Sequence, residues 1–312
     1  MTQGKLAAIS IDLDEIGCYH AIHGLTEPTL ALRHVIYDRA IPRFEQLLDD
    51  REIRATFFCV GRDLSYAPNA DAIRRLHTSG HEIANHTYSH RYDFSRGPNE
   101  EIYREVEQGI DAIARVTGER PIGFRAPGYT INQRVLDVLT ALGVSYDSSV
   151  FPSPWYYLAK AAALGFMRLR GKRSRSILDT PHMLRAPGDP YQVGTPYWKR
   201  AQGLWELPIG VTRATTARFP YIGTSLILAG AVGSRFLTRC IAGRPLVNLE
   251  LHGIDQIDAD QDGIAYLKPF QPDLKKSLSH KVHCLSAAID ELQRLGYHFR
   301  PLKDAIPSNI AH

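Results

Sequence analysis

The ten residues HEIANHTYSH, numbered 81 to 90, hold three of the thirteen histidines of this 312-residue chain. The run HEIAN follows a glycine and predicts a short buried strand that begins at His81. His86 and His90 lie four residues apart, so on a helical turn both imidazoles would face one way and suit a single metal ion. His81 begins the strand instead, and we interpret it as a structural residue.

Alternating strand and helix patterns surround this stretch, which is typical of repeated strand–helix units. Strands are expected over 6–14, 53–61, 81–86, 121–128, 144–151, 204–211 and 245–253, and helices over 31–50, 69–79, 98–118, 133–143 and 281–296. The region 152–203 lacks this rhythm, and we predict that it is a ligand-contacting insertion. The whole chain, residues 1–312, is then expected to form a single catalytic domain.

Composition and charge exclude several classes of protein. The net charge of +4 is too small to indicate nucleic-acid binding, and no nucleic-acid recognition motif is present. The first fifteen residues lack the apolar segment of a signal peptide, and no run reaches the ~20 apolar residues of a membrane span. The four cysteines form no CxxC pair, which favours free thiols in a reducing compartment. We therefore expect a cytoplasmic protein.

The run SIDLDE, residues 10–15, places Asp12 and Asp14 on one face of the first strand, near its carboxyl end. Active sites of α/β barrels lie at that end. Two imidazoles and one of these carboxylates would leave a metal coordination position open for water or substrate, as in catalytic sites. Zn²⁺ fits this ligand set best, and Co²⁺ or Ni²⁺ could substitute for it. The other aspartate is then free to act as a general base.

Five motifs in this order resemble the polysaccharide deacetylase family, also called the NodB-homology domain or carbohydrate esterase family 4. They are SIDLDE (10–15), HTYSH (86–90), FRAPG (124–128), YDSSVFPSPW (146–155) and LELHG (249–253). The resemblance implies a distorted (β/α) barrel, seven-stranded, and metal-dependent removal of acetyl groups from amino sugars. Leu13 separates the aspartates that are adjacent in most members, and Glu15 replaces their glycine. This D-x-D form is similar to a subgroup of cell-wall deacetylases and allantoinase-like hydrolases.

The resemblance also implies residue roles. Asp14 would bind the metal together with His86 and His90, and Asp12 would be the catalytic base. Arg125 would orient the base by charge-assisted hydrogen bonds, and His252 would be the catalytic acid. The N–H of Gly128 would be an oxyanion donor. Trp155 and Asp147 would line the substrate groove.

Other functions stay open at this point. The chain could hydrolyse a non-sugar amide or a cyclic ureide, or deformylate an amino sugar linked to polyprenyl phosphate. A catalytically silent sugar- or lipid-binding module is a third alternative, although it would not need the full set of acid, base and metal ligands. A cytoplasmic location favours a lipid- or nucleotide-linked precursor as substrate. Segments 155–175 and 221–240 are apolar with basic ends, so they either rest on the inner membrane face or pack on the barrel.

Overall fold

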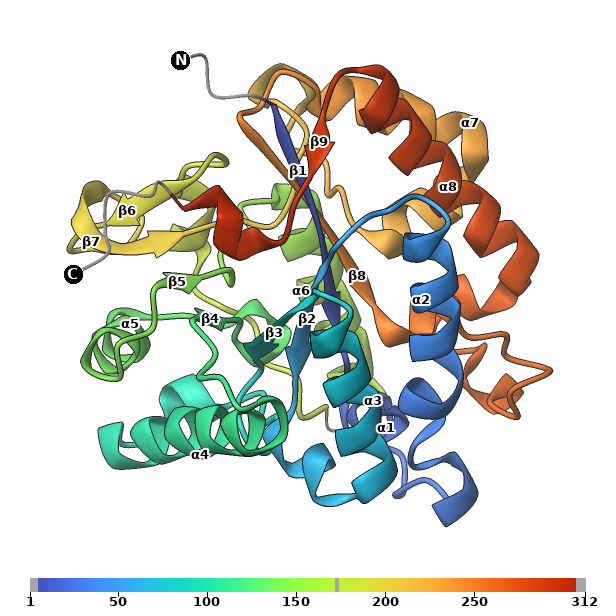
Figure 1. Ribbon diagram of the computed structural model, residues 1–312, viewed down its shortest axis with the longest axis horizontal. Coiled ribbons are helices and arrows are strands. Elements are labelled where there is room, and N and C mark those ends of the chain that lie inside the picture. Colours follow the sequence, from blue (N-terminus) through green and yellow to red (C-terminus); the bar gives the residue numbers. More distant parts are fainter. Residues whose placement is uncertain (1–4, 172–173, 307–312) are drawn as a thin grey trace.

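Parallel strands run through the centre of the molecule and helices surround them (Figure 1). The computed structural model describes residues 5–171 and 174–306. Two parts of the sequence discussed above lie outside these ranges. They are residues 1–4, within the first fifteen residues, and residues 172–173 of the segment 155–175. The described strands are β1 (Leu6–Asp12), β2 (Thr56–Cys59), β3 (Glu82–Asn85), β4 (Gly123–Phe124), β5 (Tyr146–Asp147), β6 (Tyr191–Val193), β7 (Arg200–Glu206), β8 (Leu246–His252) and β9 (His298–Phe299).

The strands are joined in the order β6-β7-β5-β4-β3-β2-β1-β8. All pairs from β7 to β8 are parallel, so seven strands make up the predicted parallel set. Strand β6 pairs antiparallel with β7, and β9 adds to β1 in parallel. The short β4 and β5 are much briefer than the runs expected from the sequence, because most of their apolar residues belong to the connections.

Residues 207–222 bridge the seam between β7 and β8. The N–H of Gly210 donates to the carbonyl of Asn248 at 2.8 Å, and Ile222 forms a parallel bridge with Glu250. The Asn248 amide also donates to the carbonyl of Leu207 at 3.3 Å. The sheet is therefore curled toward closure, and the expectation of a distorted (β/α) barrel is confirmed.

Alternation along β1 separates two layers of the core. Ile9 and Ile11 pack with the surrounding helices, whereas Ala8 packs on the other face with residues of β2, β3 and β5. Because successive side chains of a strand point to opposite faces, Ser10 and Asp12 share the inner face with Ala8. The inner layer of the barrel thus becomes polar toward the carboxyl end of β1.

The helices follow the sequence pattern closely. They are α1 (Ile16–His23), α2 (Ile41–Asp49), α3 (Ala67–Thr78), α4 (Asn99–Thr117), α5 (Gln133–Ala141), α6 (Pro154–Leu169), α7 (Gly223–Ile241) and α8 (Leu278–Arg294). The single helix expected over 31–50 is instead a π-helical turn at Ile36–Ala40 followed by α2. Pro42 lies in the first turn of α2, where the missing N–H has no helical partner to lose.

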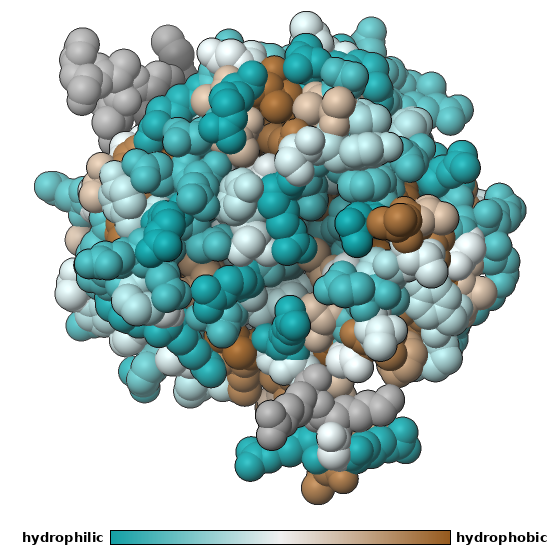
Figure 2. All heavy atoms as spheres, turned by 90° about the horizontal axis from the view of Figure 1, so that it is seen from below, coloured by the Kyte–Doolittle hydropathy of each residue, from teal (hydrophilic) through white to brown (hydrophobic). Residues whose placement is uncertain are grey.

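Region 152–203 holds more regular structure than its sequence indicated: α6, β6 and the start of β7. Helix α6 has no buried residue, whereas α7 buries Leu226, Ile227 and Ile241 and lies against α8. Among the described residues, no helix is long and apolar enough to cross a membrane. Figure 2 views the molecule from the side of the strands' carboxyl ends, and this face is mainly hydrophilic with separate hydrophobic groups.

Candidate active site

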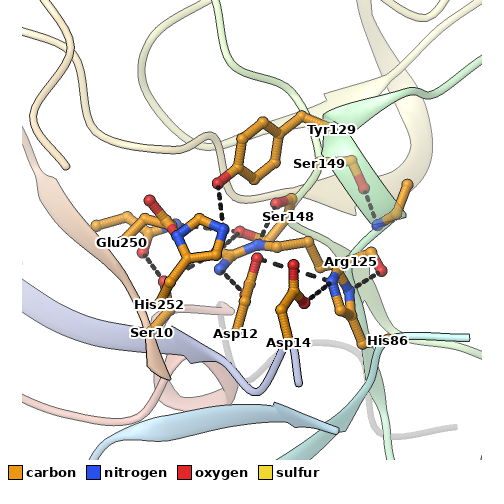
Figure 3. Close-up of polar contacts among 12 residues, drawn as sticks. Ser10, Asp12, Asp14, His86, Arg125, Tyr129, Ser148, Ser149, Glu250 and His252 are labelled. Atoms are coloured by element: carbon orange, nitrogen blue, oxygen red, sulfur yellow. Dashed lines mark hydrogen bonds and ion pairs between the residues drawn. The ribbon is translucent and has the colours of Figure 1, made fainter. Parts of the chain in front are cut away.

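Asp12 and His252 end neighbouring parallel strands in the same register. Asp12 is the last residue of β1 and aligns with His252, the last residue of β8. Their side chains meet above the sheet edge, together with Glu250 from the same face of β8 (Figure 3). Ligand-type atoms of these three residues lie within 4.8 Å of one another. The strand register alone therefore brings a carboxylate and an imidazole together.

Asp14 lies beyond the end of β1, because the strand expected over 6–14 stops at Asp12. Leu13 between them is fully buried and packs in the main apolar core. Alternation continues past the strand end, so Leu13 points into the core while both carboxylates point toward the site (Figure 3). The extra residue in the D-x-D pattern thus serves packing.

The two histidines follow β3 in a tight loop and not on the helical turn expected from their spacing. Thr87 and His90 have positive φ angles of 64° and 55°, which residues other than glycine rarely adopt. The N–H of His90 donates to the hydroxyl of Thr87 at 3.1 Å. Such strained backbone often occurs at functional sites, and here it turns His90 toward His86 and Asp14.

Asp14, His86 and His90 offer ligand atoms within 4.8 Å of one another, and all three are buried. Asp14 Oδ1 lies 3.3 Å from His86 Nε2 and 3.0 Å from His90 Nε2. Despite these short separations, Asp14 Oδ1 and both ring nitrogens of His90 have no well-aligned hydrogen bond. Buried polar atoms without partners are costly, and a divalent cation among them would satisfy all three residues. Nitrogen and carboxylate donors in this number fit zinc.

The protonation of these ligands also fits a cation. His86 Nδ1 donates to the carbonyl of Arg125 at 2.7 Å, which leaves the Nε2 lone pair directed at the site. Burial alone raises the pKa of Asp14, but the neighbouring imidazoles of His90 and His86 outweigh it and hold this pKa well below its usual value. Asp14 is therefore an anion at neutral pH.

Arg125, fully buried in the loop after β4, positions the Asp12 carboxylate. Its Nη1 donates to Asp12 Oδ1 at 2.7 Å. Its Nη2 donates to the hydroxyls of Ser10 and Ser148, both at 2.9 Å, and its Nε donates to the Ser148 carbonyl at 2.8 Å. The guanidinium is thus fixed by β1 and by the residue that follows β5, and Asp12 Oδ2 is left to face the site.

His252 has a carboxylate partner that sequence reasoning missed. Glu250 is fully buried, and its Oε1 forms an ion pair with His252 Nδ1 at 2.8 Å. Burial alone lowers the pKa of His252, but Glu250 and Asp12 outweigh it and raise that pKa well above its usual value. The Nε2 atom of His252 lies 3.4 Å from the Tyr129 hydroxyl. The i, i+2 spacing in LELH was the signal that could have identified Glu250.

The loop at Gly128 is held between two elements. Gly128 has φ 60°, and a Cβ there would approach the Tyr92 ring to 3.0 Å, so both conformation and space favour glycine. Lys160 of α6 donates to the Gly128 carbonyl at 2.9 Å. Burial lowers the pKa of Lys160 to about 8. This loop thus lies beside the metal ligands, in reach of a substrate that enters there.

Comparisons with known proteins agree with this arrangement. The family model described as polysaccharide deacetylase matches residues 35–146, which include His86, His90 and Arg125. Residues 35–146 are therefore similar to the polysaccharide deacetylase family. Asp12, Asp14 and His252 lie outside the matched residues, so their place in the site comes from the structure.

Curated relatives in the family carry deacetylase names. The chain is 34% identical to a chitooligosaccharide deacetylase of Bradyrhizobium sp. over 36% of its own length and 52% of the relative's. It is 30% identical to chitin deacetylase 1 of Saccharomyces cerevisiae over 56% of its length and 60% of the relative's. For a peptidoglycan deacetylase of Helicobacter pylori the identity is 22%, over 50% and 54%. The chain thus spans about half the length of the curated relatives that it matches.

Solved structures support the fold of the family. A candidate polysaccharide deacetylase from Mycobacterium smegmatis superposes with a TM-score of 0.54 and 18% identity, covering 100% of this chain and 96% of that one. A CE4 family pseudoenzyme from Bacillus anthracis has a TM-score of 0.51 and 12% identity, covering 96% and 65%. Since one of these neighbours is a pseudoenzyme, the fold of the family does not by itself establish catalysis.

Two residues that the family resemblance placed in the substrate groove differ in position. Asp147 of β5 is fully buried and accepts a hydrogen bond from Ser149 at 2.6 Å, and the Ser149 hydroxyl in turn accepts from the Ala126 N–H at 2.8 Å. The structure therefore gives Asp147 a supporting place under the Gly128 loop, with no surface open to substrate. Trp155 lies at the start of α6 and is 52% exposed, so it remains free to contact a ligand.

His81 has the structural place expected from its position in the strand. It is buried, and its Nδ1 accepts a hydrogen bond from the Ala55 N–H at 3.1 Å. The ring packs edge-on against Phe57. Burial, together with the nearby Arg54, lowers the pKa of His81 to about 4, so the ring is neutral. The opening stretch therefore divides into one packed histidine and two that face the metal site.

A cavity of about 1130 Å³ lies beside His90, a candidate metal ligand. Its lining combines α1, the loop after β2, the loop after His90 and residues 174–177. Five arginines contribute to it: Arg33, Arg62, Arg91, Arg96 and Arg175. Arg62 lies 3.7 Å from Asp63, and Arg91 pairs with Asp93 at 3.3 Å. Four carboxylates also line it: Glu15, Glu27, Asp63 and Asp93. Arginines and carboxylates therefore lie together next to the candidate metal site.

Proposed function

We propose that this protein is a member of the polysaccharide deacetylase family that hydrolyses the N-acetyl group of an amino sugar with the help of a divalent metal ion. The main support for this proposal is the arrangement of the side chains. A carboxylate fixed by an arginine, a three-residue metal-ligand set and a histidine paired with a carboxylate all face one space. The deacetylase names of the relatives support the reaction class. Zinc is the metal that we propose, with cobalt or nickel as substitutes.

Asp14, His86 and His90 would hold the metal, which would polarise the amide carbonyl and make a water molecule more acidic. Asp12 accepts the proton of the attacking water at Oδ2, since its Oδ1 is occupied by Arg125. The hydrogen bond from Arg125 fixes the orientation of the carboxylate for this step.

The leaving nitrogen receives a proton from His252. Its Nδ1 faces Glu250, so the proton that it gives up is the one on Nε2. The raised pKa of His252 keeps the imidazole protonated at neutral pH. The N–H of Gly128 donates to the amide oxygen as negative charge develops there. Acetate and a free amine are the products.

The decisive experiment measures acetate release from a panel of N-acetylated amino sugars, with and without chelator. We expect release that chelator abolishes. Asp12→Asn should lose about 10²–10⁴-fold in kcat, the usual contribution of a general base, while its metal content stays at the wild-type level. Asp71→Asn changes an exposed aspartate of α3 and is the matched control. Wild-type activity in Asp12→Asn would remove it as the base, and silence on every substrate would favour a binding module.

The arginine-lined cavity favours a second candidate substrate, an amino sugar that carries an anionic group. Lipid- and nucleotide-linked precursors belong to this class, as does a formylated amino sugar on polyprenyl phosphate, and all would suit an enzyme acting in the cytoplasm. A cyclic ureide lacks such a group and would make no charge-assisted contact with the arginines. Comparing kcat/KM for an N-acetylated sugar and for its phosphate shows whether the enzyme prefers the anionic substrate.

We also propose that residues 1–312 act as one catalytic domain, in which 152–203 shapes the substrate entrance.

A further inference from the structure

Helix α6 exposes an apolar stripe on the side away from the active site. At 3.6 residues per turn, four of its residues fall within a sector of about 80°. They are Trp155, Leu158, Phe166 and Leu169, with exposed fractions of 52%, 61%, 54% and 88%. No residue of this 16-residue helix is buried. A surface helix of a globular protein normally turns its apolar stripe toward the core, and α6 does the reverse.

The opposite side of α6 explains why the helix nevertheless stays in place. Lys160 donates to the Gly128 carbonyl, and the Tyr156 ring packs against Tyr129 and Phe151 at centroid distances of 5.6 and 4.6 Å. The helix is therefore attached to the active-site loop through its polar and aromatic face. On its outward stripe the Arg170 guanidinium lies 4.1 Å from the centre of the Phe166 ring, and all four apolar residues remain exposed.

Charge indicates what would cover the stripe. From Pro154 to Leu178 the sequence contains no acidic residue, and basic residues gather where α6 ends. Arg168, Arg170 and Arg175 are exposed. Lys172 and Arg173 belong to the same run but lie outside the described residues. An apolar stripe with a tryptophan at one end and a cluster of cations at the other is the pattern of a helix that lies in the interface of an anionic bilayer.

We propose that α6 docks this protein on the surface of a membrane containing anionic lipids. The stripe enters the boundary between headgroups and acyl chains, and the arginines contact lipid phosphates. Because the other face of α6 holds the Gly128 loop, the bound membrane would lie next to the substrate entrance. Ser174, Arg175 and Ile177, at the end of the basic run, line the cavity beside His90.

Helix α7 offers a matched control, because it also exposes three apolar residues: Leu228, Val232 and Phe236. It differs in two respects. Its opposite face is buried against the barrel, and its Arg239 is neutralised by Glu291 at 2.7 Å. Exposed apolar area is thus present on both helices. A cluster of exposed arginines accompanies α6, whereas α7 carries the exposed Arg235 beside the paired Arg239.

The test is flotation of the full chain with vesicles of phosphatidylcholine alone or with phosphatidylglycerol. We expect binding to the anionic vesicles at low salt, at least a tenfold loss in 0.5 M salt, and weak binding to the neutral vesicles. The triple variant Leu158→Ser, Phe166→Ser, Leu169→Ser should lose at least tenfold in binding. It should keep wild-type thermal unfolding and wild-type acetate release from a soluble sugar, since all three side chains are exposed.

The equivalent triple variant of α7, Leu228→Ser, Val232→Ser, Phe236→Ser, should bind anionic vesicles like the wild type. Absence of wild-type binding at low salt would overturn the proposal, as would an equal loss in both triple variants. A change in oligomeric state of the α6 variant without a change in vesicle binding would instead assign the stripe to a second copy of the chain. Vesicle binding, thermal unfolding and oligomeric state do not depend on catalysis, so failure of the deacetylase proposal would leave this one standing.

Discussion

Glu250 shows how much one side chain can change the chemistry of its neighbour. It is fully buried, it lies 2.8 Å from His252 Nδ1, and it is the leading charge that raises the pKa of that histidine. A catalytic acid must be protonated at working pH, so the carboxylate extends the pH range in which His252 can donate. Glu250 is thus a positioning residue that acts through His252.

The variant Glu250→Gln tests this role. Without the negative charge the pKa of His252 falls, so the alkaline limb of the kcat/KM profile should move to lower pH. Activity at pH 8 should fall by about 10–100-fold, which is less than the ~10²–10⁴-fold that general acid catalysis contributes in full, while metal content stays unchanged. Glu45→Gln alters a carboxylate paired with Arg75 at the surface and should leave the profile in place. An unshifted alkaline limb in Glu250→Gln would limit the residue to a packing role.

Among single residues, the sequence predicted those candidate site residues that belong to recognisable motifs. Asp12, Asp14, His86, His90, Arg125 and His252 all come together in the structure. Tyr129 and Lys160 were not predicted. The position of Tyr129 depends on its positive φ angle, and that of Lys160 depends on where α6 lies. Asp147 was misplaced, since a motif match does not reveal that the carboxylate lies under the loop.

At the scale of elements, the position of the histidine loop depends on how closely α4 approaches β3. The point of contact is Gly109, where a Cβ would lie 2.2 Å from the Asn85 amide oxygen and 3.0 Å from the Thr87 backbone. Asn85 in turn donates to the Val106 carbonyl at 2.9 Å. The helix therefore presses directly on the residues that flank His86.

We predict that Gly109→Ala moves this loop and weakens metal binding. Overpacking of this kind costs about 1–3 kcal/mol in the free energy of unfolding, and zinc affinity should fall with it. Denaturant unfolding and zinc titration measure the two effects. In Gly165→Ala of α6 the new methyl group meets nothing within 4 Å, so a gain of about 0.5–1 kcal/mol is expected there. Equal zinc affinity in Gly109→Ala and the wild type would contradict the prediction.

Long amphipathic elements were predicted best from the sequence. Helix α4 was expected over 98–118 and spans Asn99–Thr117, because its apolar face and terminal Gly118 are local signals. Strands β4 and β5 are two residues long, so no periodicity could define their ends. Region 152–203 was expected to be an insertion in which segment 155–175 rests on a membrane or packs on the barrel. It contains α6, whose exposed apolar residues lack the usual relation between pattern and burial.

For the whole molecule, the metal ligands connect the end of β1 with the loop after β3. A ligand that binds only the folded chain stabilises it by mass action, by about 2.7 kcal/mol at a concentration 100 times its Kd. We therefore expect zinc to raise the midpoint of thermal unfolding of the chelator-treated protein. Asp12→Asn should keep this increase, and His90→Ala should lose it. An increase of the same size in His90→Ala would place the zinc elsewhere.

Arg125 makes two different contributions, which evolution can separate. Its carbonyl accepts the Nδ1 proton of His86, and its guanidinium holds Asp12. Every amino acid supplies a carbonyl, but only arginine supplies that fork. A descendant that lost the side chain at position 125 would therefore lose the organised base and keep an oriented metal ligand. We expect that substitution at this position leads to metal-binding proteins without catalysis. Restoring the single arginine codon should then restore the oriented base and with it the catalytic activity.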